Sequence, residues 1–314
     1  MSESAAVFPG QGSQSVGMLA ELAQAHDLVD ETFGEASAAV QRDLWALVSD
    51  GPADELNQTR WTQPAMLAAD VAAWRIYRES GGAMPTALAG HSLGEYAALV
   101  AAGAMDLADA AAVVHERGRL MQAAVPAGEG AMAAVLGLDD SRVAEICESA
   151  AGDEVVAPAN FNAPGQVVIA GHRAAVQRAI EACRTAGARR AMELPVSVPA
   201  HSSLMLGAVD GLRMALANVR MRSPAVPVLH NLDLRPRDEP DDIRAALVEQ
   251  LTHPVPWTGT IRALTERGVD RFLECGPGRV LCGLGRRIRR GAEWTALDTP
   301  DAIAQAAAEQ GARA

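Results

Sequence analysis

The sequence predicts an α/β fold in which helices cover a mainly parallel sheet and a second, smaller domain is inserted into the first. Two patterns support this. Outside residues 128–200, short apolar runs that end in glycine-rich turns alternate with longer stretches whose apolar residues recur at helical spacing. Within residues 128–200, shorter strands and helices follow one another more closely. A length of 314 residues agrees with about two domains.

The first part of the larger domain begins with the apolar run ESAAVF (3–8), a predicted strand that leads into the turn-rich loop PGQGSQ (9–14). Apolar residues at helical spacing predict helices at 21–40 and 64–80. Residues 85–105 then combine a short apolar run, a glycine-flanked turn and an alanine-rich helix. Strands that alternate with helices in this way favour a parallel sheet.

The inserted segment is predicted to hold six elements in the order β-α-β-β-α-β, which is the ferredoxin-like order. The strands are expected at 131–138, 155–161, 166–172 and 189–198, and the helices at 140–151 and 173–187. We therefore assign residues 1–127 and 201–314 to the larger domain and residues 128–200 to the inserted one.

The larger domain resumes with a predicted helix at 202–219 and an apolar run, VPVLHN, at 226–231. A second helix is expected near 240–251, followed by a strand at 270–278 that ends in a glycine turn. The alanine-rich segment 302–314 is expected to be helical.

Composition excludes several classes of chemistry. All 27 basic residues are arginines, so the chain has no lysine for a Walker A loop, a Ser–Lys dyad or a Schiff base. The net charge of −12 argues against general nucleic-acid binding. The four cysteines form no CxxC pair and no zinc-type spacing, so we expect reduced thiols and no metal site. No secretory signal or membrane span is visible, and we expect a cytoplasmic protein.

The segment GHSLG (90–94) matches G-x-S-x-G, the nucleophile elbow of a strand–turn–helix. Glycines on both sides allow a turn tight enough to expose the Ser92 hydroxyl at a helix N-terminus, where developing negative charge is favoured. In such an elbow the N–H of the next residue, Leu93, is one oxyanion donor. The alternative is a structural glycine turn that happens to contain a serine.

A serine nucleophile needs a base, which in this chain must be a histidine, a carboxylate or the N-terminus. His91 adjoins Ser92 in sequence but should point away from it on such a turn. His201 follows the inserted domain directly, at a domain junction where clefts form. Position alone makes His201 only a modest favourite over His230 and His253. The remaining histidines lie in or beside predicted helices: His26, His115 and His172.

Arg117 falls on the apolar stripe of its predicted helix, together with Leu107, Ala110, Val114 and Met121, whereas Arg119 points elsewhere. An inward guanidinium needs an anionic partner, and its planar fork suits a carboxylate. That partner is either a substrate or an internal Asp or Glu in a structural ion pair.

Two further glycine-rich stretches, PGQGSQ and GPGRVLCGLG (276–285), are interpreted as turns. The first follows the first strand and so lies near the strand carboxyl ends, where sites form. The segment RRIRR is either a solvated helix face or a docking point for an acidic partner; its arginines are Arg286, Arg287, Arg289 and Arg290.

Taken together, these motifs resemble the malonyl-CoA:acyl carrier protein transacylases of fatty acid synthesis and the related acyltransferase domains of polyketide synthases. The resemblance covers nearly the whole chain in the family's order. It is carried by FPGQGSQ, TQPA, GHSLGEYAAL, RGRLMQ, ANFNAPGQVVIAG, PVSVPAH, LTHPVPWT and ECGPGRVL.

The resemblance implies an α/β-hydrolase-like core and assigns a role to each site residue. Ser92 would be the acylated nucleophile and His201 its general base, oriented by the main-chain carbonyl of Gln250. The N–H groups of Gln11 and Leu93 would form the oxyanion hole. Two side chains would line the substrate pocket: Arg117, on the malonyl carboxylate, and Gln63, in its wall.

The implied reaction moves a malonyl group from the coenzyme A thioester to the phosphopantetheine thiol of an acidic acyl carrier protein, with no bound cofactor, no metal, no nucleic acid and no membrane. The segment VPAH (198–201) is similar to the stand-alone malonyl enzymes. The alternatives are a polyketide acyltransferase acting in trans, a serine hydrolase or thioesterase, and a non-catalytic scaffold that binds a carrier protein. Because lysine is absent, carrier docking would rely on arginines.

Overall fold

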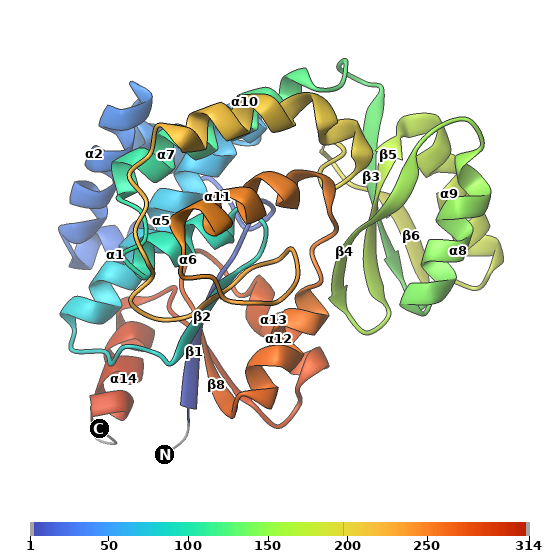
Figure 1. The fold of residues 1–314 in the computed structure, drawn as a ribbon. Coiled ribbons are helices and arrows are strands. Elements are labelled where there is room, and N and C mark those ends of the chain that lie inside the picture. The colour runs from blue at the N-terminus through green and yellow to red at the C-terminus, as the bar shows by residue number, and fades with distance from the viewer. Residues whose placement is uncertain (1–2, 197, 312–314) are drawn as a thin grey trace.

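The computed structural model describes residues 3–196 and 198–311. A five-stranded parallel sheet forms the centre of the larger body, in the order β7-β2-β1-β8-β9 (Figure 1). This confirms the α/β class and the parallel sheet. The strands span β1 Glu3–Phe8, β2 Ala87–Gly90, β7 Val228–Leu229, β8 Val269–Glu274 and β9 Glu293–Ala296.

The sheet is buried on both faces, which is why β1 is a continuous apolar run rather than an alternating one. Ala6 and Phe8 pack into one core cluster, and Ala5 and Val7 into another on the opposite face. The first cluster lies under α1 Ala20–Ala25, α2 Leu28–Val40, α3 Leu44–Asp50, α4 Ala53–Leu56, α5 Thr59–Glu79, α6 Gly94–Ala101, α7 Leu107–Ala123, α10 Leu206–Ala217, α11 Pro240–Glu249 and α14 Pro300–Gly311. The second lies under α12 Trp257–Glu266 and α13 Val280–Ile288.

A separate antiparallel sheet lies to one side of the larger body, in the order β4-β5-β3-β6 (Figure 1). Its elements are β3 Gly130–Leu136, α8 Asp140–Ala151, β4 Val156–Ala163, β5 Gln166–His172, α9 Arg173–Thr185 and β6 Arg190–Glu193. The two helices and the sheet enclose their own apolar cluster. Backbone hydrogen bonds tie β4 to the larger body, since Phe161 N–H donates to Val255 O and Val255 N–H donates to Ala159 O.

Three predicted elements differ from the structure. The helix predicted at 21–40 is two helices, α1 and α2, with a break at His26. The strand predicted at 189–198 ends at Glu193, because Pro195 has no N–H to extend the ladder, and residue 197 lies outside the described residues. The stretch 276–285 is a turn only in its first half, because α13 begins at Val280.

Gly285 in α13 is required by packing rather than by a turn. A Cβ at Gly285 would stand 2.2 Å from the ring of Trp294, so glycine is what allows α13 to contact β9. Strand β9, which contains Trp294, has no counterpart among the predicted elements. Within the part of the chain that is described, no helix is long and apolar enough to cross a membrane.

Candidate active site

The elbow between β2 and α6 is so tight that only glycine fits on either side of it. A Cβ on Gly90 would come within 1.9 Å of the Gly94 carbonyl carbon, and one on Gly94 within 2.1 Å of Phe8 O. Ser92, between them, has a left-handed backbone with φ of 52°. A non-glycine residue held there is strained, and such strain is concentrated at functional sites. The turn therefore presents the Ser92 hydroxyl at the start of α6, at the carboxyl end of β2.

His201 lies against Ser92 although 108 residues separate them in the chain. Its Nε2 is 2.7 Å from Ser92 Oγ. Its Nδ1 is 2.9 Å from the main-chain oxygen of Gln250 and 3.1 Å from that of His253. Because carbonyl oxygens only accept, Nδ1 carries the proton and Nε2 faces the serine as an acceptor. Two carbonyls thus orient the imidazole where a triad would use a carboxylate.

The environment of His201 favours the neutral imidazole. The side chain is buried, and burial together with the nearby Arg117 guanidinium lowers its pKa to about 3, against the opposing effect of the Gln250 carbonyl. A histidine that stays neutral at neutral pH can accept the serine proton. Like Ser92, it has a left-handed backbone, with φ of 60°.

Arg117 points from α7 into the same site and is buried. Nη1 donates to Gln63 Oε1 at 2.8 Å, and Nη2 donates to Gln250 Oε1 at 3.0 Å and to Ser92 Oγ at 3.3 Å. Its Nε has no hydrogen-bond partner among the described residues, and no acidic side chain there forms an ion pair with it. The internal ion pair considered as an alternative for Arg117 is therefore not formed.

The loop after β1 lies directly against the elbow. A Cβ on Gly10 would approach His91 O to 2.4 Å, so only glycine lets the two backbones come this close. Gln11 follows, with its side-chain Nε2 donating to Thr59 Oγ1. Within the described chain, the backbone N–H groups of Gln11 and Leu93 donate no hydrogen bond, which leaves both available to a ligand.

The three other histidines considered as a base make their ring contacts with groups other than Ser92. His91 turns away from Ser92, and its Nε2 lies 2.8 Å from Asn162 Oδ1 on β4 of the smaller sheet. His253 contributes its main-chain oxygen to His201 but directs its own ring to Glu249 O. His230 is buried with its Nδ1 2.7 Å from Glu95 Oε1.

This geometry can be compared with known proteins. The acyl transferase domain family matches residues 6–293. The chain belongs to that family. This acyl transferase is 54% identical over 306 residues to the malonyl CoA-acyl carrier protein transacylase of Escherichia coli K12, covering 98% of this chain and 99% of the relative.

Solved structures give the same family. The malonyl CoA-acyl carrier protein transacylase of Coxiella burnetii has a TM-score of 0.97 and 49% identity, covering 98% of both chains. A malonyl-transacylase in complex with a type II PKS acyl-carrier protein has a TM-score of 0.96 and 50% identity, covering 98% of this chain and 100% of that one.

Sequence reasoning missed two residues that hold the elbow of this acyl transferase. Asn231, which follows β7, accepts from Ser92 N–H at 2.7 Å through Oδ1 and donates to Gly90 O at 2.7 Å through Nδ2. Glu95 is completely buried and accepts from Asn231 N–H. A signal was present in both cases. Glu95 belongs to the quoted motif GHSLGEY, and Asn231 ends the run VPVLHN at the carboxyl end of a strand.

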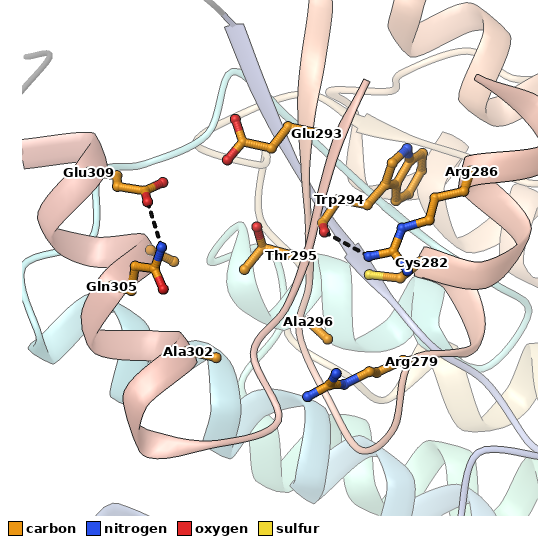
Figure 2. Close-up of a pocket in the computed structure, with 11 residues that line it drawn as sticks. Arg279, Cys282, Arg286, Glu293, Trp294, Thr295, Ala296, Ala302, Gln305 and Glu309 are labelled. Carbon is orange, nitrogen blue, oxygen red and sulfur yellow. Dashed lines mark hydrogen bonds between the residues drawn. The ribbon is translucent and has the colours of Figure 1, made fainter. Parts of the chain in front are cut away.

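The arginine cluster at the end of α13 lies apart from these residues. Arg286, with Arg279, lines a hollow of about 230 Å³ between α13, β9 and α14, where it donates to Trp294 O (Figure 2). Arg287 donates to Gln166 Oε1 and to Pro164 O and thereby ties α13 to the β4–β5 turn. None of the residues that line the hollow belongs to the Ser92 site.

Proposed function

We propose that this acyl transferase moves a malonyl group from malonyl-CoA to the phosphopantetheine thiol of an acyl carrier protein, through a malonyl ester on Ser92, and so supplies fatty acid synthesis. One observation carries the proposal. Within the described residues, an arginine that donates hydrogen bonds only to neutral oxygens lies 3.3 Å from a serine that is hydrogen-bonded to a neutral histidine. A site of this kind suits an acyl thioester whose far end is a carboxylate.

In the first half-reaction, Ser92 Oγ attacks the thioester carbonyl carbon while His201 Nε2 takes the hydroxyl proton. The carbonyl oxygen becomes an oxyanion, and the free N–H groups of Gln11 and Leu93 donate to it. As the tetrahedral intermediate collapses, the C–S bond breaks and the coenzyme A sulfur takes the proton from His201. The products are the malonyl ester of Ser92 and free coenzyme A.

The second half-reaction uses the same groups in reverse. The carrier thiol gives its proton to His201 Nε2 and its sulfur attacks the ester carbon. The new oxyanion is held by the same N–H groups, and Ser92 Oγ leaves with the proton from His201. No step needs a metal or a bound redox cofactor, and the coenzyme A thioester enters only as substrate.

Arg117 supplies the preference for a carboxylated acyl group. Its guanidinium is held by the amide oxygens of Gln63 and Gln250, which fix its position without neutralising its charge. A malonyl carboxylate on Arg117 holds the ester carbonyl beside Ser92 and occupies space that water would need for hydrolysis. A serine hydrolase or thioesterase would have no use for this guanidinium. A polyketide acyltransferase acting in trans would share the chemistry and differ only in its carrier.

The finer architecture and the docking surface belong to the same proposal. An α/β-hydrolase-like core (1–127 and 201–314) is supported by the strand–elbow–helix that carries Ser92. A ferredoxin-like domain (128–200) is supported by the strand order β4-β5-β3-β6. An acidic carrier protein would dock on the exposed arginines of the α13 end: Arg286, Arg287, Arg289 and Arg290.

Intact-protein mass spectrometry after mixing with malonyl-CoA, acetyl-CoA and methylmalonyl-CoA tests the proposal. We expect a malonyl adduct that Ser92→Ala abolishes and that persists in water until carrier protein is added. Arg117→Ala should shift the preference from malonyl toward acetyl. Rapid discharge to water without carrier would establish a hydrolase instead, and no adduct with any thioester would favour a non-catalytic scaffold.

A further inference from the structure

Glu95 takes no part in the acyl-transfer steps, yet it is a completely buried carboxylate on the first turn of α6, three residues after the nucleophile. Oε1 lies 2.7 Å from His230 Nδ1. Oε2 accepts from Asn231 N–H at 2.9 Å and from Gln250 Nε2 at 2.9 Å. A buried carboxylate requires such donors, and here one of them is the side chain that touches Arg117.

Glu95 is the charged one of two acceptors that set which way the Gln250 amide faces. A carboxylate only accepts, so the NH₂ end of the amide must point toward it. That NH₂ also donates to Ser92 O at 3.1 Å. The carbonyl end is left to face Arg117 Nη2 at 3.0 Å, where a donor is present. The two hydrogen bonds therefore run in one direction: Arg117 donates to Gln250, and Gln250 donates to Glu95.

Gln250 serves two parts of the site through different atoms. Its main-chain oxygen orients His201, and its side-chain oxygen holds Arg117. A reversed amide would turn its NH₂ toward the guanidinium and set donor against donor, while the contact to His201 would remain. Arg117 would lose its position, but the pair of Ser92 and His201 would keep its own.

We propose that Glu95 is a positioning residue for the acyl-group preference. It fixes the amide of Gln250 so that a neutral oxygen, rather than a carboxylate, holds Arg117, and the guanidinium stays free to bind the carboxylate of the incoming acyl group. This inference rests on the proposed function, because it concerns the selection of a carboxylated thioester by Arg117.

The variant Glu95→Gln tests the inference, because it removes the charge and keeps the shape. Its NH₂ can face His230, whose Nε2 is buried with no partner among the described residues and can take the ring proton. At the Oε2 position the NH₂ would meet two donors, Asn231 N–H and Gln250 Nε2, so the amide oxygen of the variant stays toward Gln250. A neutral amide oxygen holds the Gln250 NH₂ less strongly than a carboxylate does, so the amide of Gln250 is held less firmly against Arg117. We therefore expect the ratio of the loading rate constants for malonyl-CoA and acetyl-CoA to fall about tenfold.

Glu274→Gln is the matched control. Glu274 is also completely buried and accepts two backbone N–H groups, from Leu281 and Cys282, but its carboxylate makes no hydrogen bond to Gln250 or Arg117. This variant should lose stability and keep the wild-type ratio. A structural role for Glu95 would lower both loading rates together, as a general loss of folded protein does.

A second variant, Gln250→Met, removes the amide and leaves the main-chain oxygen for His201. The ratio of the malonyl-CoA and acetyl-CoA loading rate constants should also fall about tenfold in this variant. Adding Glu95→Gln should change that ratio no further, because the two residues act through one contact. This arm applies even if Glu95→Gln does not fold.

Each outcome has a distinct meaning. A wild-type enzyme without a preference for malonyl would overturn the proposed function itself. A wild-type preference that Glu95→Gln leaves unchanged, or that Gln250→Met leaves unchanged, would overturn the role of Glu95. Independent, additive losses in the double variant would show that Glu95 does not act through Gln250.

Discussion

Replacing Arg117 should change the pH dependence of acyl transfer, because its charge acts on the base. Ser92 Oγ lies 3.3 Å from Arg117 Nη2 and 2.7 Å from His201 Nε2, so the two nitrogens are within about 6 Å of each other. At an effective dielectric constant of about 20, unit charges at that distance interact by about 3 kcal/mol, or about two pKa units. Spreading the charge over the guanidinium reduces this to about one to two units.

The direction follows from the sign of the charge. A cation beside His201 disfavours the imidazolium, and with burial it lowers the pKa of His201 to about 3. The base should therefore stay neutral, and acetyl loading of Ser92 should be flat with pH down to about pH 4.5 in the wild type. In Arg117→Met the pKa of His201 should rise. The pH below which the acetyl loading rate declines should therefore increase by about one to two units.

Malonyl-CoA should produce part of the same effect in the wild type, because its carboxylate offsets the charge of Arg117 once bound. At saturating substrate, the acid limb for malonyl loading should thus lie above that for acetyl loading. Quenched-flow mass spectrometry of Ser92 acylation between about pH 3 and 8 measures these limbs.

Arg119→Met is the control for that series. Arg119 lies on the same helix but is exposed and paired with Glu116, so its loss should leave the profile unchanged. A wild-type acid limb near the ordinary histidine value of about 6.5 would refute the reasoning, because neither burial nor Arg117 would then be acting on His201. So would an Arg117→Met profile identical to that of the wild type.

Two further changes test the surroundings of the elbow. Asn231→Ala should leave the half-buried Ser92 N–H and the buried Gly90 O without their present partners. It should lower the free energy of unfolding by about 2–4 kcal/mol in chemical denaturation and slow acylation more than it weakens substrate binding. Asp70→Asn should stabilise the protein increasingly from about pH 4 to pH 8 in thermal unfolding. Asp70 is buried, and neither of its carboxylate oxygens has a hydrogen-bond partner in the part of the chain that the structure describes. Burial, aided by the charge of Glu274, raises the pKa of Asp70. Its folded-state pKa thus exceeds the unfolded one, so wild-type stability falls as the pH rises between them. A difference in melting temperature that shrank over this range would contradict the sign.

Local patterns in the sequence were enough for the α/β class, because strands buried on both faces are continuous apolar runs and β1 and β2 end at glycine turns. The glycine pattern was less informative in α13. Gly285 is needed for contact with Trp294, a residue nine positions later on another element, and a pattern of single letters does not distinguish that need from a turn. Strand β6 ends at Glu193, earlier than predicted, because of Pro195. The prediction followed the apolar residues beyond Pro195 and gave the proline too little weight.

The features of the site also separate into those that local sequence determines and those that tertiary contacts determine. The sequence alone determined the elbow around Ser92 and the inward face of Arg117, since both depend on neighbours within two helical turns. Which histidine meets Ser92 depended on chain segments 109 residues apart, and the carbonyls that orient it are 49 and 52 residues from His201. The tertiary structure decided that two carbonyls hold His201 and that, among the described residues, Arg117 donates hydrogen bonds only to neutral oxygens. It also decided that Asn231 and Glu95 hold the elbow in place. The reason is that hydrogen bonds between distant segments are set by packing, which leaves no periodic trace in either segment.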